Sequence, residues 1–216
     1  MTKPIGILGG SFDPIHFGHL RLAKECIDQA GLDKVLFVPV NSPVHRNPLV
    51  ANPGQRFEML SLAIENSSQF EISDSEINRG NVSYTIDTLR TLRKSYIDSP
   101  LCLIMGIDAF LTFDSWKDWE KIPEYAHLII TNRPNFNSKI NKPILEQFLN
   151  SRLSKDKGEL ATQTCGKIIM IEIPNLDISS SRIRELLGQG RYIDYLLPDP
   201  VIDYITTNKI YAGINK

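Results

Sequence analysis

The chain has few of the features that mark several large classes of protein. Its three cysteines, Cys26, Cys102 and Cys165, follow no recurring spacing, so no disulfide framework is expected. The 24 lysines and arginines balance the 25 aspartates and glutamates, and the net charge of -1 lacks the basic field that nucleic-acid binding requires. No apolar run approaches the ~20 residues of a membrane span, and no leader-like segment opens the chain. These absences predict a cytoplasmic protein that binds neither nucleic acid nor membrane.

Two common nucleotide-binding patterns, G-x-G-x-x-G and G-x-x-x-x-G-K-[ST], are also missing. A different glycine-rich stretch, GGSFDPIHFGH at residues 9–19, follows the apolar run 5–8. The apolar spacing after it predicts a helix from Gly18 to Ala30, with His16 and His19 at its first turn. Free N–H groups, the helix dipole and two imidazoles converge there, which predicts a phosphate-binding turn.

Two other interpretations of this histidine pair have to be considered. His16 and His19 have a spacing that zinc ligands can have, but the cysteines are scattered and His45 and His127 are isolated, so zinc fits poorly. A purely structural role at the edge of the core remains open for the pair taken alone. The glycines before it favour the phosphate-binding interpretation.

A second candidate phosphate element lies near the C-terminus, where ISSSRIR at residues 178–184 follows the strand-like run Ile168 to Ile173. Its serines offer N-cap hydroxyls and free N–H groups, and Arg184 lies one turn later, within reach of a triphosphate. The alternative is an ordinary serine-capped amphipathic helix whose apolar face packs on the core. Two such elements bracketing one chain favour a nucleotide site.

Strand-like and helical patterns alternate along the chain. This alternation predicts an α/β, Rossmann-like, doubly wound and mostly parallel sheet with helices on both faces, in one domain spanning residues 1–216. Ligands in such sheets bind at the carboxyl ends of the strands, where Gly9, His45, Gly106 and Asn132 are expected. The expected strands are 5–8, 34–40, 70–77, 101–105, 128–131 and 168–173, and the expected helices include 18–30, one around 57–64, and 83–96.

Several motifs together carry a resemblance to a known family. Residues 9–19 and 178–184 resemble the H-x-G-H and I-S-S-S/T-x-I-R elements of a nucleotidyltransferase superfamily. Others narrow the resemblance to bacterial nicotinate mononucleotide adenylyltransferases: PVHR at 43–46, QRFEML at 55–60, SYTIDTL at 83–89, GID at 106–108, WKDW at 116–119 and NRP at 132–134. The chain departs from the family pattern at Ser11, where threonine is usual, and at Val44, where proline is usual.

The resemblance implies a reaction and a set of site residues. The family joins the adenylyl group of ATP to nicotinate mononucleotide and releases pyrophosphate, with Mg²⁺ bound mainly through the ATP phosphates. It implies His16, His19 and Arg184 as catalytic residues. The implied ATP contacts are Gly9, Gly10, His16, His19, Gly106, Asp108, Arg133, Ser179, Ser180, Ser181 and Arg184. The implied mononucleotide contacts are Ser11, Phe12, His45, Arg46, Tyr84, Thr85 and Trp116, and a homo-oligomer is compatible with the family.

Three alternatives remain open from the sequence. Another adenylyltransferase of the superfamily, such as the phosphopantetheine enzyme, would share the first two motifs but not SYTIDTL or the paired tryptophans. Nicotinamide mononucleotide differs from nicotinate mononucleotide only in its ring substituent. A nucleotide-sensing module without catalysis would bind ATP and release no pyrophosphate. For the ring contact, Trp119 is the alternative to Trp116.

Overall fold

The structure, a computed structural model, describes residues 2–42, 49–132, 140–174 and 176–212. The chain forms two compact units, each assembled from separate stretches of sequence. The first comprises Met1–Gly9, Ala23–Leu36 and Tyr84–Asn175, and the second comprises Gly10–Leu22, Phe37–Ser83 and Leu176–Lys216. The single domain expected from the sequence stays a prediction.

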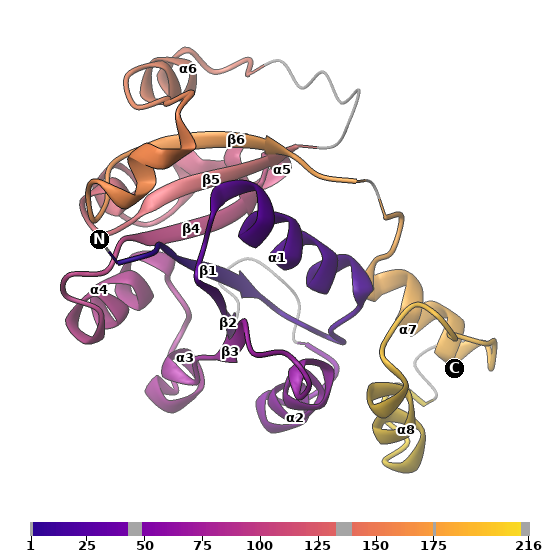
Figure 1. Cartoon of the computed structure of the whole chain (residues 1–216). Coiled ribbons are helices and arrows are strands. Elements are labelled where there is room, and N and C mark those ends of the chain that lie inside the picture. Colours follow the sequence, from indigo (N-terminus) through magenta and orange to yellow (C-terminus); the bar gives the residue numbers. More distant parts are fainter. Residues whose placement is uncertain (1, 43–48, 133–139, 175, 213–216) are drawn as a thin grey trace. The chain divides into compact units, whose positions relative to one another are not determined.

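One six-stranded sheet organises the fold, with the strand order β3-β2-β1-β4-β5-β6 (Figure 1). β1 pairs with β4, β4 with β5 and β5 with β6, all in parallel, in keeping with the predicted parallel, doubly wound sheet. The strand order reverses direction between β1 and β4, and this is the place where such sheets bind ligands. The strands are β1 (Ile5–Gly10), β2 (Lys34–Pro39), β3 (Phe70–Ile72), β4 (Leu101–Gly106), β5 (His127–Asn132) and β6 (Ile168–Glu172).

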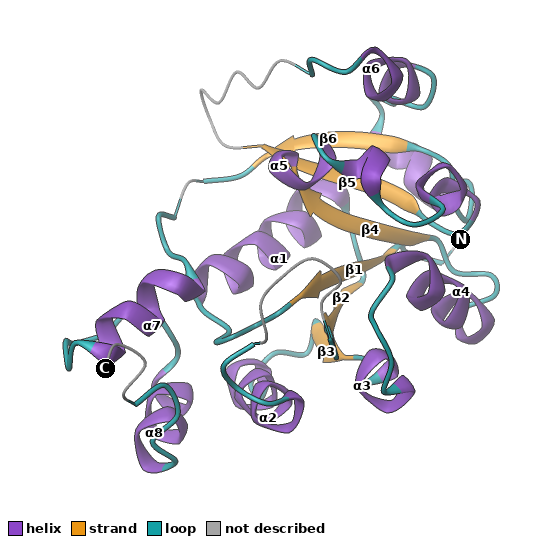
Figure 2. Cartoon of the chain, turned by 180° about the vertical axis from the view of Figure 1, so that it is seen from behind, coloured by secondary structure: helices purple, strands orange, loops and turns teal. Residues whose placement is uncertain are grey.

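Helices cover both faces of the sheet, as predicted, because right-handed crossovers that run in opposite directions from β1 place their helices on opposite sides. α1 and α4 lie on opposite faces (Figures 1 and 2). The helices are α1 (Phe17–Ala30), α2 (Pro53–Ile64), α3 (Ser75–Arg79), α4 (Thr85–Ser95), α5 (Ile107–Phe110), α6 (Pro143–Asn150), α7 (Ser180–Gly188) and α8 (Asp199–Thr207). Short 3₁₀ turns span Phe113–Ser115, Trp119–Glu124 and Lys157–Ala161.

The core of the first unit explains one glycine of the opening strand. Apolar side chains of β4 and β5 are buried almost throughout, as expected for strands that are covered on both faces. A Cβ added at Gly6 would lie 2.9 Å from side-chain atoms of Ile104, Leu32 and Val35. Gly6 therefore allows β1 to pack closely in this core, and it is not part of a nucleotide fingerprint.

The predicted strand over residues 70–77 is wrong beyond Ile72. β3 ends there, and residues Ser75–Arg79 form the short helix α3. The Ser73 hydroxyl donates to the Ser75 hydroxyl at 3.0 Å, and Gly80 ends the helix with a φ of 70°. Small hydroxyl residues favour such turns because they bond locally, and this local chemistry overrides the apolar alternation of the segment.

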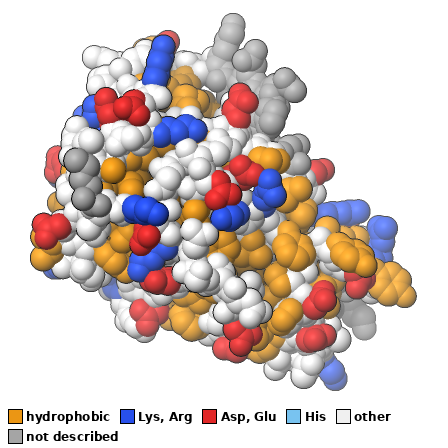
Figure 3. Space-filling view, viewed as in Figure 1, with side chains coloured by type: hydrophobic (Ala, Val, Ile, Leu, Met, Phe, Trp, Pro, Cys, Tyr) orange, Lys and Arg blue, Asp and Glu red, His pale blue; other side chains and the backbone are white. Residues whose placement is uncertain are grey.

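The surface carries charges of both signs. On the face drawn in Figure 3, lysine and arginine side chains are interspersed with aspartate and glutamate side chains. This mixing agrees with the near balance of charges in the sequence. Within the described ranges, none of the helices has the length and apolar character needed to cross a membrane.

Candidate active site

The loop after β1 brings two histidine rings into contact. α1 begins at Phe17, and the ring centroids of His16 and His19 are 3.7 Å apart. A Cβ added at Gly18 would lie 2.9 Å from two ring atoms of His16. Glycine is therefore required between the histidines because any other side chain would displace the His16 ring.

Burial makes both imidazoles weak bases in the free protein. His16 is 6% exposed, and desolvation lowers its pKa from 6.5 to about 4. Desolvation also lowers the pKa of His19 well below 6.5, and the charge of His16 lowers it further. The Nδ1 atoms of both rings are buried and have no hydrogen-bond partner in the described part of the chain. A buried polar atom without a partner is costly, and a bound anion could supply the missing contact.

The ring of Phe12 packs against the ring of His19. Its side chain is fully buried, and its ring meets the His19 ring edge-on at 5.1 Å between centroids. Its φ of 47° lies in the left-handed region, and a Cβ at Gly10 would lie 2.9 Å from its ring. The Phe12 side chain therefore packs inside the loop, so a mononucleotide could contact only its backbone.

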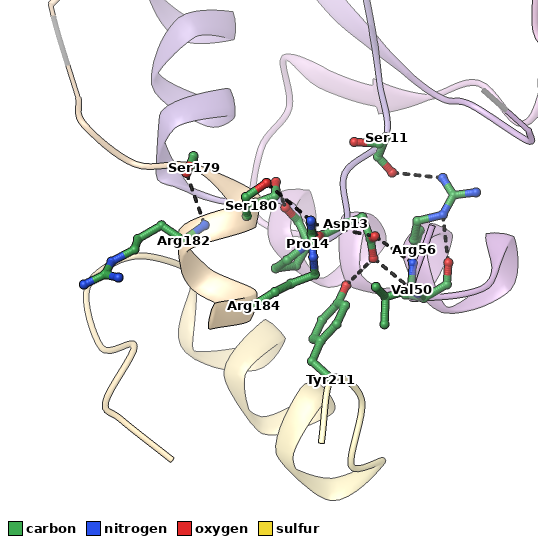
Figure 4. A network of polar contacts seen from close by, with 12 residues as sticks. Ser11, Asp13, Pro14, Val50, Arg56, Ser179, Ser180, Arg182, Arg184 and Tyr211 are labelled. Carbon is green, nitrogen blue, oxygen red and sulfur yellow. Dashed lines mark hydrogen bonds and ion pairs between the residues drawn. The ribbon is translucent and has the colours of Figure 1, made fainter. Parts of the chain in front are cut away.

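α7 carries the second predicted phosphate element (Figure 4). The Ser179 hydroxyl accepts a bond from the Arg182 N–H and caps the helix, and the Ser180 hydroxyl donates to the Pro14 carbonyl at 2.9 Å. The Ser181 hydroxyl accepts from Arg184 Nη2 at 3.3 Å. All three hydroxyls thus hold the local fold, and of the first α7 amides those of Ser180 and Ser181 are left to face an anion.

Asp13 is the centre of a buried polar network that sequence reasoning missed. Its carboxylate, 1% exposed, accepts bonds from the Val50 N–H (2.9 Å), the Ala51 N–H (3.0 Å) and the Tyr211 hydroxyl (2.7 Å). Arg184 Nη1 donates to the Asp13 backbone carbonyl at 2.6 Å (Figure 4). The network ties residues 11–19, here called the histidine loop, to α7 and to the segment after α8 that carries Tyr211. The Asp13–Pro14 peptide bond is cis.

Arg56 is a fully buried cation beneath the same loop. Its guanidinium donates to three backbone carbonyls, those of Ser11 (2.9 Å), Ala51 (3.2 Å) and Asn41 (3.3 Å). Desolvation lowers its pKa. The resemblance of residues 55–60 to the family marks this position, but no local pattern indicates that the arginine points inward.

In the first unit, the predicted ring-binding residues Tyr84 and Thr85 begin α4. The N-cap residue Tyr84 makes no side-chain cap, so the first amides of the helix lack a capping hydroxyl. Lys117 Nζ lies 3.0 Å from Asp87 Oδ2 and 4.4 Å from the Tyr84 ring centroid. Burial opposes ionisation of Asp87, but bonds and charges from Lys117 and Arg90 lower its pKa on balance. The acidic side chain in the first turn is thereby neutralised, and the helix N-terminus can still attract an anion.

The two tryptophans have different surroundings. Trp119 packs against Phe113 and Phe148, with ring centroids 5.7 Å and 4.9 Å away. Trp116 meets Phe113 edge-on at 5.4 Å, and both tryptophans are half-buried. Trp119 is thus held in an aromatic cluster between two rings, and this difference favours Trp116 for stacking on a ligand.

The remaining predicted residues fall in two groups. Gly106 ends β4 and a Cβ added there would meet no atom within 4 Å, while Asp108 is exposed in α5 at the carboxyl end of that strand. Gly9 is the last residue but one of β1, the neighbour of β4 in the sheet. His45, Arg46 and Arg133 lie outside the described residues.

No cluster of three or more His, Cys, Asp or Glu side chains in the described segments could hold a metal ion. Asp13, the carboxylate within the histidine loop, accepts three hydrogen bonds from protein groups and so is poorly placed to bind a cation. A metal ion would therefore have to be held largely by a bound ligand.

Comparison with known proteins agrees with this geometry. A profile of the cytidylyltransferase-like family matches residues 7–186. A probable nicotinate-nucleotide adenylyltransferase of Psychromonas ingrahamii is 42% identical over 209 residues, 97% of each chain. Another from Methylococcus capsulatus is 40% identical and covers 96% of this chain and 99% of its own. The fold matches Plasmodium falciparum nicotinic acid mononucleotide adenylyltransferase with a TM-score of 0.72, at 23% identity over 97% of both chains. The chain therefore belongs to the cytidylyltransferase-like family and, within it, to the nicotinate-nucleotide adenylyltransferases.

Proposed function

We propose that the chain transfers the adenylyl group of ATP to nicotinate mononucleotide, giving nicotinate adenine dinucleotide and pyrophosphate in NAD biosynthesis. The observation that carries the proposal is the contact between His16 and His19, whose buried Nδ1 atoms have no hydrogen-bond partner among the described residues. Ser180 of α7 donates to the Pro14 carbonyl and so holds the segment that carries these histidines. Relatives about 40% identical over nearly the whole chain are named for this reaction. The Plasmodium falciparum enzyme has been solved with NaAD and with APC.

The chemistry is an in-line displacement at the α-phosphorus of ATP. A phosphate oxygen of the mononucleotide forms a bond to that phosphorus, and the bond to the bridging oxygen breaks, leaving its electron pair with pyrophosphate. The attacking phosphate is already ionised, so no general base is required, and catalysis depends on positioning and charge neutralisation. Neutral imidazoles of His16 and His19, the first amides of α7 and the Arg184 guanidinium donate to the phosphates.

Other residues bind the ribose of ATP and the pyridine ring of the mononucleotide. Asp108 accepts hydrogen bonds from the ribose hydroxyls of ATP. Gly106 leaves open space, since a Cβ added there would meet no atom within 4 Å. The uncapped first turn of α4, with Thr85, binds the ring carboxylate, and Trp116 stacks on the pyridine ring. Mg²⁺ would be held through the ATP phosphates, where it would neutralise charge, because the described residues offer no group of three or more His, Cys, Asp or Glu side chains to hold it. We also propose that His45 and Arg46 contact the mononucleotide and that Arg133 contacts ATP.

The test is an assay of pyrophosphate release and product mass with Mg-ATP and, separately, nicotinate mononucleotide, nicotinamide mononucleotide and phosphopantetheine. Dinucleotide formed with the nicotinate form supports the proposal. Turnover of phosphopantetheine alone would contradict it, and ATP binding without any pyrophosphate would identify a sensing module.

A pair of histidine variants sharpens the assay. His19→Asn is expected to lower kcat about 10²–10³-fold, because a donor to the phosphates is lost. His127→Asn is the matched control, since His127 is buried with Nε2 against the Gln163 carbonyl and Nδ1 accepting from the Lys167 N–H. It should lose stability and retain kcat. Equal loss of kcat in the two variants would contradict the role of His19. Cytoplasmic location and homo-oligomer formation also stay proposals, which fractionation and light scattering can test.

A further inference from the structure

The C-terminal segment places a buried tyrosine against the histidine loop. Tyr211 is 3% exposed, and its hydroxyl donates to Asp13 Oδ1 at 2.7 Å across 198 residues of sequence (Figure 4). Burial, and then the charge of Asp13, raise its pKa far above the usual value, so the hydroxyl remains a donor. Its φ of 67° lies in the left-handed region, which bulky residues avoid.

Arg184 lies beside this network without forming a close ion pair with it. Its Nη1 donates to the Asp13 carbonyl oxygen at 2.6 Å, but the distance from Nη1 to the Asp13 carboxylate Oδ2 is 3.8 Å. That carboxylate instead accepts hydrogen bonds from the Val50 and Ala51 amides and from the Tyr211 hydroxyl. The three donors disperse the carboxylate charge and leave the guanidinium bound to a neutral carbonyl.

We propose that Tyr211 is a positioning residue for ATP, whose hydroxyl satisfies Asp13 and thereby keeps Arg184 available to the triphosphate. The inference rests on the proposed function of the histidine loop and α7. It adds a role for a residue outside both motifs and links the C-terminal segment to phosphate binding.

The physical basis is competition between two anions for one cation. Without the Tyr211 hydroxyl, the buried Asp13 carboxylate loses one of its two donors at Oδ1 and must find a replacement. Arg184, whose Nη1 lies 3.8 Å from Oδ2 of the same carboxylate, is a cation within reach, and an ion pair with it would compensate the buried charge. A triphosphate would then have to displace Asp13. We expect affinity for the triphosphate to fall about tenfold.

The experiment compares Tyr211→Phe with Tyr195→Phe. Tyr195 makes a good control because it has a similar φ of 63° but is 90% exposed. Four constants are measured for each protein: KM for ATP, KM for nicotinate mononucleotide, and the inhibition constants of tripolyphosphate and adenosine. Y211F should raise the ATP and tripolyphosphate constants about tenfold and leave the other two within about twofold. Y195F should change none of them.

Two further variants keep the test decisive. In an Arg184→Gln background, Y211F should no longer weaken tripolyphosphate binding, because the residue through which it acts is gone. If Y211F does not fold, Val50→Pro removes another donor to Asp13 from an exposed position and should raise the same two constants. A uniform rise in all four constants, or no change in a folded Y211F, would overturn the proposal. An inactive wild-type protein would instead count against the proposed function, and tripolyphosphate binding could still be compared directly.

Discussion

Stability should fall as the pH drops below neutral, because His16 is buried in its neutral form. The pKa of His16 is about 4 in the folded protein and 6.5 in the unfolded chain. Between these values the unfolded chain binds more protons than the folded one, so the free energy of unfolding rises with pH. Stability is therefore complete above about pH 6.5 and is lost progressively as the pH falls towards 4. Each unit of difference in pKa corresponds to about 1.4 kcal/mol.

The loss attributable to His16 is about 2 kcal/mol on going from pH 7 to pH 5, and about 3 kcal/mol by pH 4. His16→Asn lacks the titrating group and should lose correspondingly less stability over the same interval. The assay is urea denaturation at pH 7, 6 and 5, followed by circular dichroism, with the free energy of unfolding extrapolated to water. The quantity compared is the pH-dependent change, so a constant difference in stability between the two proteins does not affect it.

Equal pH-dependent losses in wild type and H16N would refute the reasoning, because they would show that His16 titrates alike in the folded and unfolded chains. Desolvation is the main cause of the lowered pKa of His19, and the charge of His16 adds to it, so H16N should also reduce the part of the acid sensitivity that His19 owes to that charge. A bound triphosphate favours the charged imidazole. Saturating ATP should therefore reduce the acid-induced loss in wild type.

Three other substitutions have defined outcomes. Gly18→Ala should lower kcat/KM about 10²-fold with the fold retained by circular dichroism, since its Cβ would displace the His16 ring; wild-type activity would contradict the close packing. Arg56→Met should lower the free energy of unfolding in urea by about 3 kcal/mol, because three carbonyls lose their donor; a loss below about 1 kcal/mol would argue against the buried network. Thr85→Ala should raise KM for the mononucleotide severalfold more than KM for ATP, and equal rises would remove Thr85 from the ring site.

The elements that the sequence predicts well are those whose apolar period matches their burial. The helix Phe17–Ala30 and the strand Leu101–Gly106 each differ from expectation by one residue. The sequence also predicts a capping serine at the start of α7, and Ser179 is that N-cap, because a serine before an amphipathic run is a local signal. Each of these predictions depends on residues within one turn or one strand, which is the range that periodicity reports.

What the sequence could not predict depends on partners far along the chain. Tyr211 and Asp13 are 198 residues apart, and Arg56 binds carbonyls that follow other elements. Nothing near these residues indicates that a charged side chain turns inward, because the satisfying groups are backbone atoms brought together only by the fold. The bond from the Ser180 hydroxyl to the Pro14 carbonyl shows the same limit, because the two residues are 166 positions apart; the ATP contact of Ser180 stays a prediction.

The polar residues under the histidine loop are hard to explain by stability alone. Burying Asp13 and Arg56 incurs large desolvation costs, and well-packed apolar side chains could often stabilise a fold as well. Apolar side chains, however, cannot hold a particular backbone N–H or carbonyl in place. Asp13 binds two amides and Arg56 binds three carbonyls, so together they define the path of the chain on either side of the loop. An anion site built from amides and imidazoles needs that path held before the ligand arrives, because its donors act only at hydrogen-bond distance. We therefore expect substitutions at Asp13 or Arg56 to impair phosphate binding even where compensating mutations restore stability.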